Sequence, residues 1–219
     1  RHVLVLETNL TYVEKCQIFH YSYLVRKAGH ELTGNMKKRY DQLVRTKRYR
    51  KLKSLYKKYK DADNKKALKD VCDQMKEMQK QYDVTWDYCR TSMIPIGKKY
   101  GIDAVFALTK AEDVFRGIEK CLYSDGETIH FKKRGDLPCI RAKQTNRGII
   151  MKQMNFKFKD IGFGVKIKDR YEQEEVDAIL YYLKHAEFMD SIAANTYKET
   201  NVCISTYRPC YVSLVCKKI

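Results

Sequence analysis

The sequence has no long apolar segment. None of its uninterrupted apolar runs approaches the roughly 18 residues that a membrane-spanning helix needs, and Arg1-His2-Val3 does not have the layout of a signal peptide. These absences predict a soluble, intracellular protein without a membrane partner. Eight cysteines are scattered along the chain, with no C-x-x-C pair and none at zinc-ligand spacing from a histidine. We therefore expect reduced, partly buried thiols and no metal site.

Catalytic motifs are also missing. The sequence has no G-x-x-x-x-G-K phosphate loop, no serine or cysteine in a nucleophile elbow, and no pair of histidines at ligand spacing. Asp160-Ile161-Gly162 follows an alternating segment, as does the strand-borne aspartate that holds Mg²⁺ in RNase H-like nucleases. No second acidic residue stands at a comparable strand end. We interpret Asp160 as a turn residue and expect no catalytic residue here, with a nuclease remnant as the alternative.

Positive charge is what the chain has in excess. It has 44 Lys and Arg against 27 Asp and Glu, a formal net charge of +17, which is typical of a protein that meets phosphate or an anionic membrane surface. The charge is densest over residues 37–60, where twelve Lys or Arg accompany Asp41 alone. Because like charges on one helix repel each other, a phosphate backbone that neutralises them is the favoured explanation. An exposed helix or coiled-coil edge is the alternative.

The spacing of apolar residues divides the chain into a helical block and a strand-rich remainder. Residues 2–7 alternate and predict one strand, after which spacings of three and four residues predict helices as far as about residue 123. From Thr128 the spacing returns to two and predicts the short strands of a small antiparallel sheet or barrel. An amphipathic helix within residues 169–190 interrupts them, and a hairpin ending in Tyr211–Cys216 closes the chain.

Two apolar stripes are expected to be buried within the helical block. The first runs down a single long helix, and the second follows residues 61–64, a loop that can cap it. Thr109 and Glu112 have capping-box spacing and predict the start of a further helix. The tyrosines are interpreted as packing residues, with base stacking as the alternative. The stripes are Leu32, Met36, Tyr40, Leu43, Tyr49, Leu52, Tyr56 and Tyr59, and Leu68, Val71, Cys72, Met75, Met78 and Tyr82.

A second basic segment runs from His130 to Ile149, with six Lys or Arg beside one Asp. Alternating strands would place its cations on sheet faces and leave Thr145-Asn146-Arg147-Gly148 as a turn that can approach a groove or a phosphate. Positive charge would position the protein, whereas Thr and Asn could read bases. Ordinary surface charge is the alternative interpretation.

Parts of the chain resemble a known family. Residues 26–52, RKAGHELTGNMKKRYDQLVRTKRYRKL, resemble the first long helices of TnpB-like transposon nucleases, the RNA-guided ancestors of miniature type V CRISPR effectors. Residues 117–149 resemble the helix of that family that leads into the pattern FK…S…K.N..GI. Tyr211–Val215 is similar to the closing strands before the family's RuvC nuclease domain. The matching residues of the pattern are Phe131, Lys132, Cys139, Lys143, Asn146, Gly148 and Ile149.

The resemblance implies an α+β fold. It consists of a small oligonucleotide-binding-type β-barrel, called the wedge, with a helical recognition domain inserted after the first strand. The expected ranges are 1–7 for the first wedge strand, 8–126 for the recognition domain and 127–219 for the rest of the wedge. The RuvC domain, its catalytic acids and its zinc element are expected after residue 219. Mg²⁺ is expected only in that domain, so we expect no cofactor in this chain.

The resemblance also implies RNA-guided DNA binding, with guide RNA and target double-stranded DNA as partners and a prokaryotic, cytoplasmic location. The protein would hold the guide RNA scaffold and the guide–target heteroduplex while base pairing reads the sequence. Thr145 and Asn146 would contact the target-adjacent motif. The alternatives are a shortened, non-cutting relative of these endonucleases and a basic helical adaptor that docks an acidic protein. The expected backbone contacts are Lys37, Lys38, Arg39, Arg45, Lys47, Arg48, Arg50, Lys132, Lys133, Arg134, Arg141, Lys143 and Arg147.

Overall fold

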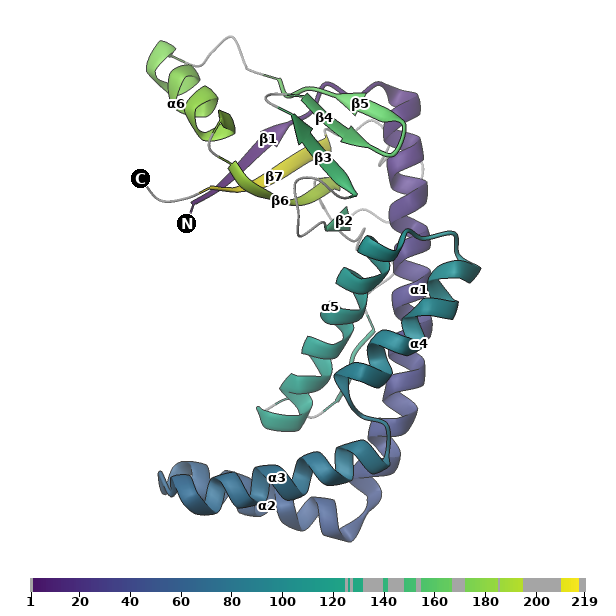
Figure 1. Ribbon diagram of the computed structural model, residues 1–219, viewed down its shortest axis with the longest axis vertical. Helices are drawn as coiled ribbons and strands as arrows, with labels where there is room; N and C mark the ends of the chain where they lie inside the picture. Colours follow the sequence, from purple (N-terminus) through teal and green to yellow (C-terminus); the bar gives the residue numbers. More distant parts are fainter. Residues whose placement is uncertain are drawn as a thin grey trace. The chain divides into compact units, whose positions relative to one another are not determined.

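The computed structural model shows a chain dominated by helices (Figure 1). No helix in the described part of the chain combines the length and the apolar character needed to cross a membrane. The residues described are 2–124, 126, 128–131, 140–141, 148–152, 155–166, 172–184, 186–194 and 210–216. The elements are β1 His2–Glu7, α1 Tyr12–Arg45, α2 Lys47–Asp61, α3 Lys65–Gln81, α4 Trp86–Lys99, α5 Ala104–Tyr123, β2 Ile140–Arg141, β3 Ile149–Lys152, β4 Asn155–Phe158, β5 Ile161–Phe163, α6 Gln173–Lys184, β6 Ala186–Ala194 and β7 Cys210–Cys216.

The chain forms two compact units whose boundaries fall inside α1, α4 and α5 and after Phe131. Unit 1 comprises Arg1–Ala28, Gly97–Lys110 and Lys132–Ile219, and unit 2 comprises Gly29–Ile96 and Ala111–Phe131. These units divide the chain by packing, whereas the ranges expected from the sequence divide it by type of secondary structure. The expected domain ranges therefore stay a prediction.

The strands of unit 1 form two antiparallel sheets. The first has the order β1-β7-β6-β2 and the second the order β3-β4-β5. β1 pairs with β7 from His2↔Cys216 to Glu7↔Tyr211, so the first strand of the chain lies beside the last one described. All the helices lie between these two strands in the sequence.

The expected oligonucleotide-binding-type barrel is wrong for the described residues. They are mostly helical, and their strands make two open sheets and no closed barrel. An isolated antiparallel bridge joins Thr8 to Val165, but it does not close a barrel. Alternating residues favour strands, whereas closure needs long edge strands that pair with each other. β2 and β5 have two and three residues, and such short strands offer few backbone groups for closure.

An aromatic cluster fills the core of unit 1. The rings of Tyr21 in α1, Phe106 in α5 and Phe158 in β4 lie 5.3 to 5.6 Å apart, centroid to centroid. The Tyr21 hydroxyl donates to the Asp103 carboxylate at 3.0 Å and accepts from the Asp103 backbone N–H at 2.9 Å. Lys159 Nζ lies 3.5 Å from the same carboxylate. These contacts attach the β4–β5 turn to the two helices.

Unit 2 buries most of the two predicted stripes, whereas Tyr56, Tyr59, Leu68, Cys72 and Tyr82 are half-buried. Leu32, Met36 and Leu43 are fully buried on α1, as expected from their spacing. The single long helix expected from that spacing is wrong, because the chain breaks at Thr46 between α1 and α2. Thr46 has an extended backbone (φ −70°, ψ 131°), and its hydroxyl accepts a hydrogen bond from the Tyr49 backbone N–H at 3.3 Å. Thr46 is therefore the N-cap of α2.

α2 and α3 form a helical hairpin in which the two helices lie side by side (Figure 1). Asn64 caps α3, as the predicted loop suggested, by accepting from the Ala67 backbone N–H at 3.2 Å. A buried polar link crosses the hairpin, because Gln79 Nε2 donates to the Tyr49 hydroxyl at 3.4 Å. Gln79 Oε1 accepts from the Tyr123 hydroxyl of α5 at 2.9 Å, so one side chain ties three helices together.

Candidate nucleic-acid interface

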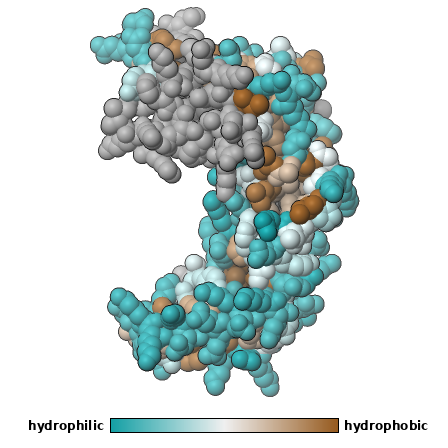
Figure 2. All heavy atoms as spheres, viewed as in Figure 1, coloured by the Kyte–Doolittle hydropathy of each residue, from teal (hydrophilic) through white to brown (hydrophobic). Residues whose placement is uncertain are grey.

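The most basic surface of the described chain belongs to α2. Its fifteen residues, KRYRKLKSLYKKYKD, include eight Lys or Arg and one acidic residue. Tyr49 and Leu52 are buried, so the cations occupy the remaining faces of the helix. Figure 2 shows hydrophilic residues covering the α2–α3 hairpin in this view. This surface fits an anionic polymer better than an apolar partner.

Four of the expected contact residues lie exposed around the α1–α2 junction. Arg45 ends α1, and Lys47, Arg48 and Arg50 occupy the first turn of α2. Within the part of the chain that the structure describes, none of the four forms an ion pair. Lys38, which lies seven residues before Arg45 on α1, is exposed as well. These side chains are available to meet phosphates.

Two other expected contact residues are engaged within unit 2. Lys37 Nζ lies 3.2 Å from an Asp41 carboxylate oxygen, one helical turn away. The Arg39 guanidinium lies 2.7 Å from the Asp83 carboxylate and 4.0 Å from the centroid of the Tyr88 ring. Arg39 thus joins α1 to the segment that connects α3 with α4. Its place in the structure indicates a packing role alongside any contact with phosphate.

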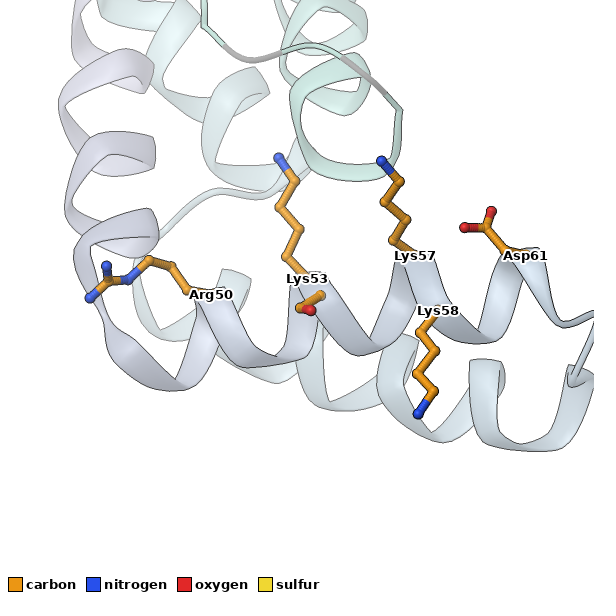
Figure 3. A pocket seen from close by; sticks show the side chains of 6 residues that line it. Arg50, Lys53, Lys57, Lys58 and Asp61 are labelled. Atoms are coloured by element: carbon orange, nitrogen blue, oxygen red, sulfur yellow. The ribbon is translucent and has the colours of Figure 1, made fainter.

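A shallow open groove of about 480 Å³ runs along α2 (Figure 3). Lys53 and Lys57 extend to one side of the helix and Lys58 to the other, while Arg50 and Asp61 lie toward its two ends (Figure 3). Lys53, Lys57 and Lys58 are not among the contacts expected from the sequence. The usable signal was the recurrence of polar residues around Ser54, with Lys57 three residues and Lys58 four residues after it. The groove is lined by Arg50, Lys53, Ser54, Lys57, Lys58 and Asp61.

Beside the groove, the C-terminal end of α5 receives side-chain donors from two other helices. Lys53 Nζ donates to the Cys121 main-chain carbonyl at 2.8 Å, and the Tyr40 hydroxyl donates to the same oxygen at 3.2 Å. The Tyr56 hydroxyl donates to the Tyr123 carbonyl at 3.5 Å. The last carbonyls of a helix have no partner inside it, and they carry partial negative charge. Lys53 therefore serves the fold as well as lining the groove.

The cysteines of the described helices are free thiols, as predicted. Burial raises the pKa of Cys89 to about 12 and also raises the pKa of Cys72 and of Cys121. A raised pKa keeps these thiols protonated at neutral pH, and a protonated thiol is a poor nucleophile.

Asp160 lies exposed in the turn between β4 and β5, which confirms its interpretation as a turn residue. The preceding residue, Lys159, has φ +53°, as tight turns between strands require. Among the residues that the structure describes, no three His, Cys, Asp or Glu side chains are grouped so that they could hold a metal ion.

The second basic segment is described only in part. Arg141 lies half-buried in β2. The other expected contacts of this segment lie outside the described residues and stay predictions. They are Lys132, Lys133, Arg134, Lys143, Thr145, Asn146 and Arg147.

Comparisons with known proteins leave the family open. A scan against protein-family models finds no match for the chain, and a search of curated proteins finds no similar sequence. The resemblance to TnpB-like nucleases stays a prediction from the sequence.

Proposed function

We propose that this chain binds nucleic acid through phosphate contacts made by the end of α1 and by α2. The observation that carries the proposal is the exposure of Arg45, Lys47, Arg48 and Arg50, none of which forms an ion pair among the described residues. Exposed like charges at this density repel each other, and a polyanion relieves the repulsion while releasing its own counterions. Flexible Lys and forked Arg side chains bind phosphates without preference for a base.

We further propose that the nucleic acid is a guide RNA and its paired DNA strand. The support for this finer proposal is the resemblance of residues 26–52 to TnpB-like nucleases, since that segment contains all the exposed cations from Lys38 to Arg50. In such a protein the α1–α2 surface would hold the backbone, and Thr145 and Asn146 would contact the target-adjacent motif. A non-cutting relative would use the same surface, and either protein would work in the cytoplasm.

The dependence of binding on salt tests the proposal. Each phosphate contact adds about 0.7 to 0.9 to the slope of log K against log salt concentration, so replacing Arg45, Arg48 and Arg50 together with Gln should lower that slope by about 2 to 3. The probes are a structured RNA hairpin and a DNA duplex of random sequence. An unchanged slope would remove the three arginines from the interface.

A matched variant controls for the loss of charge. Lys98, Arg116 and Lys157 are exposed on α4, α5 and β4, and replacing them with Gln also removes three charges. This variant should keep most of the slope, because its charges stand on elements other than α1 and α2. Copurification separates nucleic-acid binding from docking to an acidic protein, since only a nucleic-acid binder should lose its bound polymer on nuclease treatment.

A further inference from the structure

Ser54 lies among the cations of the α2 groove. Arg50 precedes it by four residues, and Lys57 and Lys58 follow it by three and four, so the three cations are neighbours of Ser54 on the helix surface. Ser54 is exposed, and its hydroxyl forms no hydrogen bond with the described residues. The groove therefore offers a neutral hydroxyl donor surrounded by positive charge.

The charges around Ser54 are not neutralised within the described part of unit 2. Lys57 and Lys58 reach out on opposite sides of α2, with Arg50 toward one end (Figure 3). Asp61 lies four residues after Lys57 and three after Lys58, yet it forms an ion pair with neither. A small anion above Ser54 could be approached by cations from both sides and from one end.

The groove offers no surface for stacking bases. Tyr49 is fully buried against Gln79, and Tyr56 is half-buried with its ring 6.0 Å from that of Tyr123. No large hydrophobic side chain of α2 is exposed. Proteins that hold unpaired bases rely on exposed aromatic rings, so this groove lacks what a base needs. A hydroxyl, a guanidinium and two ammonium groups suit the oxygens of a phosphate.

We infer that the groove is a binding site for one phosphate group, in which Arg50, Lys57 and Lys58 supply the charge and the Ser54 hydroxyl donates a hydrogen bond. The inference rests on the proposed function and makes it more specific, because it assigns a fixed geometry to one contact of the basic surface. The phosphate is either an internal phosphodiester of a nucleic acid or a terminal 5′-phosphate. Both present non-bridging phosphate oxygens that can accept hydrogen bonds in the groove.

Ser54→Ala tests the site without changing the charge of the protein. Alanine also favours a helix, so the variant should fold. Loss of one hydrogen bond should weaken binding of an RNA hairpin about three- to tenfold, with the salt slope unchanged. The matched control is Gln74→Ala, which removes an exposed neutral side chain from the neighbouring helix α3 and should leave the affinity unchanged.

The comparison of a 5′-phosphorylated hairpin with its 5′-hydroxyl form identifies the source of the phosphate. If Ser54→Ala weakens only the phosphorylated hairpin, the groove binds a terminal phosphate; if it weakens both equally, the groove binds the backbone. If Ser54→Ala matches Gln74→Ala on both hairpins, the phosphate site is overturned. In that case a lowered slope for the Arg45, Arg48 and Arg50 variant would still support the proposed function, so the two failures are distinguishable.

Discussion

Lys53 Nζ lies 2.8 Å from the main-chain carbonyl oxygen of Cys121. This contact joins the basic helix α2 to the last turn of α5, where an ammonium group meets the negative end of the helix dipole. The Tyr40 hydroxyl shares the same carbonyl at 3.2 Å. Among the cations of the groove, Lys53 is the one with a hydrogen bond inside the described structure. Removing the Lys53 ammonium group should therefore lower stability more than removing any other cation of the groove.

Lys53→Met should lower the free energy of unfolding by about 1 to 2 kcal/mol, because it deletes a charged hydrogen bond and leaves the helix propensity nearly unchanged. Lys51→Met is the control, since Lys51 is exposed on the same helix and has no partner among the described residues. Urea unfolding followed by circular dichroism measures both. Equal stabilities for the two variants would show that the contact with Cys121 does not support the fold.

Burial gives Tyr40 a pH-dependent effect on stability. It raises the pKa of Tyr40 to about 12, compared with about 10 in an unfolded chain. Between these pH values the folded state keeps the Tyr40 proton that the unfolded state releases. The contribution of Tyr40 to stability is therefore fully present below pH 10 and is lost as the pH rises toward 12. One such group contributes about 1.4 kcal/mol per pH unit over this window.

Tyr40→Phe should therefore make the alkaline loss of stability shallower, although it also deletes the hydrogen bond to Cys121 and lowers stability at neutral pH. Urea unfolding at a series of pH values from neutral to 12 gives both quantities. The difference between the two proteins should be constant near neutral pH and shrink above pH 10. A difference that stays constant throughout would mean that Tyr40 does not titrate differently in the folded state.

Gly148 and Gly117 should respond in opposite directions to the same substitution. Gly148 has φ +80°, and a Cβ there would lie 2.8 Å from Cζ of the Phe106 ring. Gly148→Ala should lower the free energy of unfolding by about 1 to 3 kcal/mol, because alanine would strain both the backbone and the packing. Gly117 lies in α5 with open space around it, so Gly117→Ala should raise the free energy of unfolding by about 0.5 to 1 kcal/mol. Thermal unfolding of both variants checks the signs, and a stabilised Gly148→Ala would contradict the packing against Phe106.

The burial of the helices could be predicted from the sequence because it depends on local spacing. Leu32, Met36 and Leu43 are buried as expected. The break at Thr46 escapes this reasoning, because buried apolar residues continue on both sides of it. The missed signal is Thr46 itself, a good N-cap residue between two stripes.

Thr109 shows how a local motif can mislead. It has capping-box spacing from Glu112, yet α5 begins five residues earlier, at Ala104. Inside the helix the Thr109 hydroxyl donates to the Val105 carbonyl at 2.8 Å. The expected helix start is wrong because the residues before Thr109 also have a face to bury, with Phe106 and Ala107 inside unit 1. Packing outweighs a capping pattern of this strength.

The features that could not be predicted from the sequence depend on contacts between residues that are distant in the sequence. The expected helix within residues 169–190 ends at Lys184, and β6 follows because Ala186–Ala194 can pair with β7. Charge density pointed to exposed cations at Arg45 and Arg50, but it could not separate them from Arg39, whose partner Asp83 lies 44 residues away. Sheet closure depends on distant pairing in the same way, and the predicted barrel is therefore wrong.

Asp61 is the single acidic residue of α2, and it places negative charge at one end of the groove. Its carboxylate is exposed and forms no ion pair among the described residues, so Asp61→Asn should leave the fold intact. Removing a repulsive charge from a solvated phosphate site should strengthen RNA binding by about 0.5 kcal/mol at low salt, roughly twofold, and the gain should vanish as salt screens it.

The control is Asp70→Asn on α3, which makes the same change on a helix with more balanced charge. Fluorescence anisotropy with the RNA hairpin at two salt concentrations measures both variants. If Asp61→Asn weakened binding, or if both variants gained equally, the phosphate would not lie in the groove beside Lys57 and Lys58.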